Sequence, residues 1–211
     1  PETAPQPGQR LPVDPLTGLP NEQAFRSRFP EEFRRARERE SNAALLAVGL
    51  DGLTALNARH GRASGDEALR AVAYVLENRR AEAGHATDRV FHLGGPSFAC
   101  YLPEASAPQA RAAAEEILDR VRRSELYLER LTVSIGLVNL YEFFLEEGPA
   151  DQIARRIGQA ALARLSLAQE QAAGTICDSP SLGRLTAPAR QTVLVVEPEP
   201  GSVDLLLRGL Q

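Results

Sequence analysis

The side chains that most often carry chemistry are thinly spread along this sequence. Cys100 and Cys177 are far apart, so they form neither a disulfide framework nor a zinc site. A nucleophilic role for Ser97 would need a His and an acid beside it, and the sequence shows no such arrangement. His60 falls in a predicted loop and His92 beside a predicted hairpin, where a structural role is the simpler interpretation. The residue types alone therefore indicate neither nucleophilic nor zinc-dependent catalysis.

Composition excludes several classes of protein. The 211 residues include no Lys, so all 24 basic side chains are Arg, and the formal net charge is −4. This acidity argues against a general nucleic-acid binder. The longest apolar run, 43–50, is far shorter than the roughly 18 residues of a membrane span. The first 12 residues lack the basic and apolar regions of a signal peptide. We therefore expect a cytoplasmic protein with reduced thiols.

The hydrophobic pattern predicts alternating helices and strands. Continuous apolar residues at 43–50 favour a central, doubly buried strand. Two short strands around Gly94 and Gly95 indicate a hairpin. Pro30 is expected to interrupt the first helix, and 140–148 has no clear assignment. Helices are predicted over 22–40, 53–60, 64–80, 107–123 and 150–173, and strands over 43–50, 89–93, 97–102, 131–139 and 175–177. The fold class is α+β, with a mainly antiparallel five-stranded sheet flanked by helices.

The two ends of the chain differ from its middle. Residues 1–12 are rich in Pro and Gln and are predicted to be a flexible linker, before a domain over 13–178. Residues 179–191 form a second predicted linker. A strand and an amphipathic helix follow over 192–211, too few residues for a complete domain.

Five motifs in register carry a family resemblance. The segment 14–21 reads DPLTGLPN, 49–53 reads GLDGL, and Asn57 is followed by Gly65 and Asp66. A Gly94-Gly95-Pro96-Ser97-Phe98 hairpin and a VSIG strand at 133–136 come later. This order and spacing resemble the GGDEF domain, the diguanylate cyclase fold, which is related to nucleotidyl-cyclase palms. The segment 193–199, VLVVEPE, is similar to the start of a response-regulator receiver domain.

The resemblance implies a metal-dependent condensation of two GTP molecules, for which this chain departs from the family's pattern. Mg²⁺ prefers oxygen ligands. The two positions that would supply acidic ligands hold Gly49 and Pro96, and of the acidic cluster only Asp51 is present. The two phosphate-clamp Lys positions hold Thr54 and, by our alignment, Leu165. We therefore expect no bound metal, no cofactor and no cyclase activity.

Two ligand sites of the family are partly kept. The resemblance implies that Asn57 and Asp66 contact guanine; the alternative is that Asn57 closes a turn and Asp66 caps a helix. The inhibitory cyclic di-GMP site corresponds to His85 and Asp88, with His85 in place of the family's Arg. We treat this pair as a candidate vestigial site.

The function expected from sequence is regulatory. The chain is interpreted as a degenerate GGDEF module of a bacterial signalling protein, not an enzyme, which acts through neighbouring domains, partner proteins or a second copy of itself. The alternative is a receptor that binds GTP or cyclic di-GMP without turnover.

Overall fold

The chain folds into a five-stranded sheet with helices on both faces. The computed structural model describes residues 11–82, 89–127 and 129–179. The sheet order is β2-β3-β1-β4-β5, and all neighbouring strands are antiparallel except β4 and β5. The strands are β1 (Ala43–Leu50), β2 (Arg89–Gly94), β3 (Ser97–Pro103), β4 (Val133–Asn139) and β5 (Ile176–Cys177). The predicted α+β class is confirmed.

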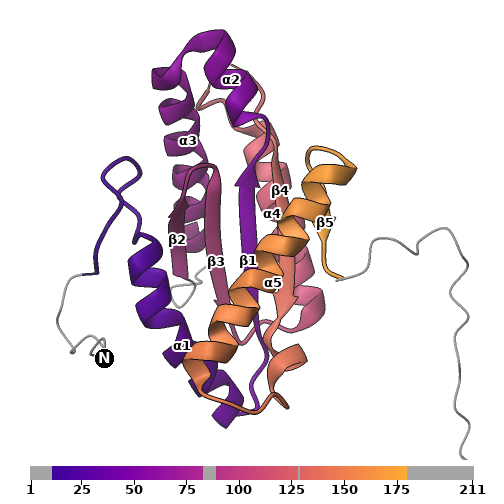
Figure 1. The fold of residues 1–211 in the computed structure, drawn as a ribbon. Helices are drawn as coiled ribbons and strands as arrows, with labels where there is room; N and C mark the ends of the chain where they lie inside the picture. Colours follow the sequence, from indigo (N-terminus) through magenta and orange to yellow (C-terminus); the bar gives the residue numbers. More distant parts are fainter. Residues whose placement is uncertain (1–10, 83–88, 128, 180–211) are drawn as a thin grey trace, which may run out of the picture.

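Two pairs of helices cover the sheet, one pair on each face (Figure 1). On one face, α1 (Glu22–Glu38) and α5 (Ala150–Gln171) pack through aromatic and aliphatic residues. On the other face, α3 (Arg62–Glu82) and α4 (Ala107–Arg123) pack through aliphatic residues and Ala. The short α2 (Leu53–His60) links the end of β1 to α3, and η1 (Leu140–Phe143) follows β4.

Strand β1 forms the centre of the molecule. Every one of its eight residues is buried, because its side chains alternate between the two helical layers. Leu46, Val48 and Leu50 contribute to the core under α3 and α4. Leu45 and Ala47 contribute to the core under α1 and α5. Strand β1 is thus packed on both faces along its whole length, up to the turn that leads into α2.

The helices differ from the predictions in their bounds. Pro30 does not interrupt α1, which runs through it; a proline inside a helix removes one hydrogen-bond donor, and the packed face of α1 outweighs that loss. The third helix begins at Arg62, two residues before the predicted start. The unassigned segment after β4 contains the 3₁₀ turn η1. Gln109 Oε1 accepts hydrogen bonds from the Ser106 backbone and hydroxyl, as expected for a helix start at Ala107.

Candidate functional site

The chemically relevant residues gather at the end of the sheet where β1 finishes. There β1 pairs with the start of β3 and of β4, so Gly49 lies opposite Ser97 on one side and Ser134 on the other. Helix α2 follows directly, and the turn after α5 reaches the same end of the sheet (Figure 1). The fold therefore brings together four of the five motif regions singled out in the sequence.

The signature hairpin is a tight two-residue connection. Gly94 and Gly95 have positive φ values of 95° and 54°, a backbone conformation that favours glycine. The carbonyl of Pro96 accepts a hydrogen bond of 2.9 Å from Leu50 N, which joins the hairpin to the end of β1. Ser97 is half-buried and Phe98 is fully buried. The hairpin is held by its backbone and by the Phe98 ring.

A second connection joins the hairpin to the N-terminal turn. The His92 ring is 4% exposed and stacks on Phe98 with centroids 4.8 Å apart. His92 Nε2 lies 3.0 Å from the Gly95 carbonyl, and Nδ1 lies 2.9 Å from Asp14 Oδ1. The same Asp14 oxygen accepts hydrogen bonds of 2.8 Å from the backbone and hydroxyl of Thr17. Both nitrogens of His92 thus lie beside oxygen atoms, although the Nδ1 contact with Asp14 does not have hydrogen-bond geometry, and the ring links the hairpin to the N-terminal turn.

The environment of Asp14 changes its acidity. Burial raises the pKa of Asp14, and the hydrogen bonds from Thr17, with a smaller contribution from His92, outweigh burial and place the pKa below its ordinary value of 3.8. Asp14 is the first residue of the 14–21 motif, and the motif predicts no partner for its side chain. Only the tertiary pairing of the N-terminal turn with β2 reveals its role.

Asp51 is engaged in contacts within the fold. Its Oδ2 accepts a hydrogen bond of 2.9 Å from Gly174 N, and its Oδ1 lies 3.4 Å from Gln169 Nε2. A Cβ at Gly49 would lie 2.9 Å from the same Gln169 nitrogen and 3.0 Å from Leu165. Helix α5 therefore covers the end of β1 with Leu165 and, one helical turn later on the same face, Gln169. The family's motifs point to Leu165 but not to Gln169. Helical periodicity places Gln169 one turn later on the same face of α5.

The side chains near Asp51 do not fit a Mg²⁺ site. Gly49 and Pro96 offer no side-chain oxygen, and Asp51 is already hydrogen-bonded. Over the described residues, no group of three or more His, Cys, Asp or Glu could hold a metal ion. We derive no chemical step through a metal at this position.

Asn57 lies against Gly65, the residue before Asp66, across the junction of α2 and α3. Asn57 Oδ1 is buried and has no hydrogen-bond partner among the described residues. A Cβ at position 65 would overlap this oxygen, so the absence of a side chain at Gly65 leaves room for it. Asp66 follows Gly65 directly and is exposed. The structure thus places Asn57 beside the residue that precedes Asp66.

Neither structural alternative for this pair fits the structure. Asn57 makes no side-chain hydrogen bond within the described chain, so its amide does not close a turn. Asp66 lies in the fifth position of α3, which starts at Arg62, so it does not cap that helix. No hydrogen bond or ion pair joins Asp66 to another described residue. Asp66 is exposed, whereas Asn57 Oδ1 is covered by the fold.

The candidate inhibitory pair, His85 and Asp88, lies outside the described residues. Its role stays a prediction. Arg89, which follows it, begins β2.

Comparison with known proteins identifies the family. A family profile described as "Diguanylate cyclase, GGDEF domain" matches residues 12–166. The chain belongs to the GGDEF domain family. The resemblance seen in the sequence is thereby confirmed at the level of the family, whereas its degenerate state and the receiver-like segment stay predictions.

Related sequences match part of this GGDEF domain chain. The diguanylate cyclase DgcP of Pseudomonas aeruginosa is 35% identical over 115 residues, which are 54% of this chain and 16% of DgcP. The uncharacterised membrane protein SERP0413 of Staphylococcus epidermidis is 30% identical over 129 residues, which are 59% of this chain and 35% of that protein. The chain thus spans about a third or less of the length of these relatives. Within the described residues, no helix combines the length and apolarity that crossing a bilayer requires.

Solved structures support the same fold. The GGDEF domain of DgcB from Caulobacter crescentus, solved with c-di-GMP, has a TM-score of 0.66 and 23% identity, covering 82% of this chain and 98% of that domain. The diguanylate cyclase SiaD of P. aeruginosa, solved with its activator SiaC, has a TM-score of 0.66 and 26% identity, covering 78% of this chain and 60% of SiaD.

The family assignment corrects one expectation. The prediction that the chain is not an enzyme is wrong. The family profile that matches the chain is described as a diguanylate cyclase, and relatives such as DgcP and SiaD are named diguanylate cyclases. That prediction rested on Gly49 and Pro96, which stand where the family has acidic metal ligands. Those departures establish which side chains stand at the end of the sheet and nothing about reaction rate.

Proposed function

We propose that this chain is a cyclic di-GMP signalling domain that binds a guanine nucleotide between α2 and the start of α3. The main support for this proposal is that the amide oxygen of Asn57 is buried and has no hydrogen-bond partner among the described residues. A buried polar atom left without a partner costs about 1–3 kcal/mol, so a ligand that satisfies it gains that amount in differential binding.

The chemistry of the pair suits guanine. An amide offers one acceptor and two donors, and a carboxylate accepts two or more hydrogen bonds. Guanine presents a carbonyl acceptor beside imino and amino donors, so Asn57 and Asp66 complement its edge. Gly65 supports this assignment, because any side chain there would displace the Asn57 amide.

Isothermal titration calorimetry with GTP tests the proposal. The wild type is expected to bind, and Asn57→Ala and Asp66→Ala are each expected to weaken binding at least tenfold, about 1.4 kcal/mol. Asn42→Ala and Asp119→Ala are matched controls, since Asn42 precedes the opposite end of β1 and Asp119 is paired with Arg123 on α4. Equal affinity in all four variants would place the guanine site elsewhere. Chromatography of the same samples measures whether cyclic di-GMP is formed.

A second proposed role is regulation through protein contact, and it is compatible with the first. The turn after β4 exposes apolar side chains: Leu145 is 98% exposed and Tyr141 is 51% exposed. Exposed apolar side chains that gather on one segment are typical of interaction sites. The related SiaD is solved in complex with its activator SiaC, which shows that a GGDEF-containing relative takes a protein partner.

Photo-crosslinking in producing cells tests this second role. A photoreactive residue at position 145 is expected to give a discrete adduct, whereas the same residue at the exposed Glu170 of α5 serves as the control. Adducts of equal yield at both positions would contradict a specific contact.

The domain boundaries are also proposals: a GGDEF domain over 13–178 and the start of a receiver-like domain at 192–211.

A further inference from the structure

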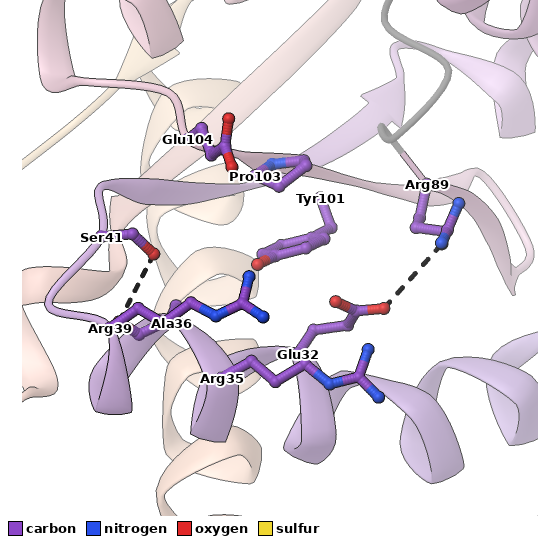
Figure 2. A pocket seen from close by; sticks show the side chains of 9 residues that line it. All are labelled: Glu32, Arg35, Ala36, Arg39, Ser41, Arg89, Tyr101, Pro103 and Glu104. Atoms are coloured by element: carbon purple, nitrogen blue, oxygen red, sulfur yellow. Dashed lines mark hydrogen bonds and ion pairs between the residues drawn. The ribbon is translucent and has the colours of Figure 1, made fainter.

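A cavity of about 270 Å³ lies between the second half of α1 and the edge of the sheet (Figure 2). It opens where β2 begins and β3 ends, which is the opposite end of these strands from the signature hairpin. Its charged lining consists of Glu32, Arg35, Arg39, Arg89 and Glu104, and Ser41 and Tyr101 contribute hydroxyl groups. None of these residues belongs to the α2–α3 junction.

The Arg89 guanidinium lacks a complete set of partners. Its Nε is buried and has no hydrogen-bond partner among the described residues. The nearest carboxylate oxygen, on Glu32, is 3.9 Å away, too far for a hydrogen bond. Figure 2 shows both side chains at the mouth of the cavity, facing each other from β2 and α1. A buried donor in this state favours an additional acceptor.

Two further donors converge on the same space. The Arg39 guanidinium extends beneath the Tyr101 hydroxyl (Figure 2), and no ion pair joins it to another described residue. Tyr101 is only 3% exposed, and within the described chain its hydroxyl makes no hydrogen bond. Burial, with a smaller contribution from Glu32, raises the pKa of Tyr101, so the hydroxyl keeps its proton and remains a donor. Arg35 is less available, because its Nε already lies 3.1 Å from Glu31 Oε1.

The charges of the lining restrict the ligand. Three guanidinium groups and two carboxylates give a small positive excess, which suits one phosphate group and disfavours a polyanion. A planar guanidinium binds phosphate oxygens through two parallel hydrogen bonds. Glu32 and Glu104 can accept hydrogen bonds from hydroxyl or amino groups beside that phosphate. The volume is near the lower end of the roughly 300–1,000 Å³ typical of ligand pockets, so the ligand is small.

We propose that this cavity binds a small phosphate monoester, with Arg39, Arg89 and the Tyr101 hydroxyl holding the phosphate. Glu32 and Glu104 accept hydrogen bonds from the body of the molecule. The site is separate from the proposed guanine site and does not depend on it.

Nuclear magnetic resonance titration tests the proposal with two probes, inorganic phosphate and ribose 5-phosphate. In the wild type, the Nε–H signals of Arg39 and Arg89 are expected to shift together and to saturate. The Nε–H signal of Arg26, an exposed Arg on the same helix paired with Glu22, is the internal control. Signals of Arg26 that move with those of Arg39 and Arg89, or no saturation with either probe, would overturn the proposal.

Variants sharpen the result. Arg39→Gln and Arg89→Gln are each expected to weaken ribose 5-phosphate at least tenfold, whereas Arg26→Gln leaves its affinity unchanged. Glu104→Gln is expected to weaken ribose 5-phosphate more than inorganic phosphate, because only the ester has a sugar whose hydroxyl groups donate to Glu104 while the phosphate is held by the guanidinium groups. Asn57→Ala should bind both probes like the wild type, so failure of the guanine site and failure of this site are distinguishable. Unchanged affinity in both Arg39→Gln and Arg89→Gln would refute the assignment.

Discussion

Two polar side chains on the helices of this molecule, Arg164 on α5 and Asn57 on α2, differ in how their terminal atoms are bonded, although Arg164 Nε is also buried without a partner among the described residues. The Arg164 terminal nitrogens donate to the Leu137 carbonyl at 2.6 Å and to both carboxylate oxygens of Glu142 at 3.1 and 2.5 Å. Asn57 Oδ1 is equally inaccessible and has no partner among the described residues. The first group therefore holds α5 to β4 and η1, and the second is the atom that we propose a guanine nucleotide satisfies. The Arg164→Ala and Gly65→Ala variants test that difference directly, and the Asp51 and Asp14 variants extend it to other polar groups.

The largest effect is expected from Arg164→Ala. The Arg164 side chain is 5% exposed, and its loss removes the donor of the Leu137 carbonyl and of Glu142 Oε2, while Glu142 Oε1 keeps the Asn139 N–H. Removing one partner of a largely buried pair costs about 3 kcal/mol of unfolding free energy. Urea denaturation measures this loss. Arg155→Ala breaks an exposed pair with Asp151 on the same helix and should leave the unfolding midpoint nearly unchanged. Equal midpoints for the two variants would contradict the structural role of Arg164.

An intermediate effect is expected from Asp51→Ala. This substitution removes the acceptor of the Gly174 N–H and the neighbour of the Gln169 amide. Hydrogen bonds to a charged group are worth about 1.5–3 kcal/mol, so we expect a loss of about 1.5 kcal/mol. Differential scanning calorimetry measures it. Asp178→Ala, which breaks only an exposed contact with Arg111, is the control. A loss no larger than that of the control would show that Asp51 does not anchor the turn after α5.

Asp14→Asn should change how stability depends on pH. Because the pKa of Asp14 is lowered in the folded state, its ionised form stabilises the fold above the unfolded pKa of about 3.9. That contribution is lost as pH falls through the lower, folded pKa. The wild type should therefore lose more stability than the variant between pH 5 and pH 2, as measured by urea midpoints at each pH. Parallel curves would contradict the coupling of Asp14 to Thr17 and His92.

The smallest effect on stability, and the sharpest test of the comparison, is expected from Gly65→Ala. The new methyl group would displace the Asn57 amide. Replacing Gly by Ala in a helix gains up to about 1 kcal/mol, which offsets that displacement, so the unfolding free energy should change little. GTP binding should nevertheless fall at least tenfold. In Gly158→Ala, the control in α5, a Cβ would lie 3.7 Å from Phe25, an ordinary contact, and GTP affinity should be retained. Retained GTP affinity in Gly65→Ala would remove the link between Asn57 and the nucleotide.

Periodicity was sufficient for most of the fold. The continuous apolar residues of β1 predicted a strand buried on both faces, and all eight residues are buried. The paired glycines predicted the hairpin, and both have positive φ values: Gly94 ends β2 and Gly95 begins the two-residue turn. Pro30 was misjudged because local propensity ignores the aromatic face that α1 buries against α5 and the sheet.

The candidate site was predicted only in part. Asn57 and Asp66 came from their motif, and the structure places Asn57 against Gly65, the residue before Asp66. Gln169, Gly174 and the Asp14 contact with His92 were missed, because each joins segments more than 70 residues apart in the chain. Local sequence patterns do not predict contacts between segments so far apart in the chain.

The sequence by itself determined the family, the order of helices and strands, and the residues that stand at each motif position, because these depend on local pattern and residue type. Only the tertiary structure decided which polar groups are already satisfied and which are not. That distinction separates Asp51, bonded to Gly174, from Asn57, whose amide oxygen is buried without a partner in the described chain. Hydrogen bonding depends on distances of about 3 Å between atoms that the chain brings together from far apart, so it is settled only when the fold is complete.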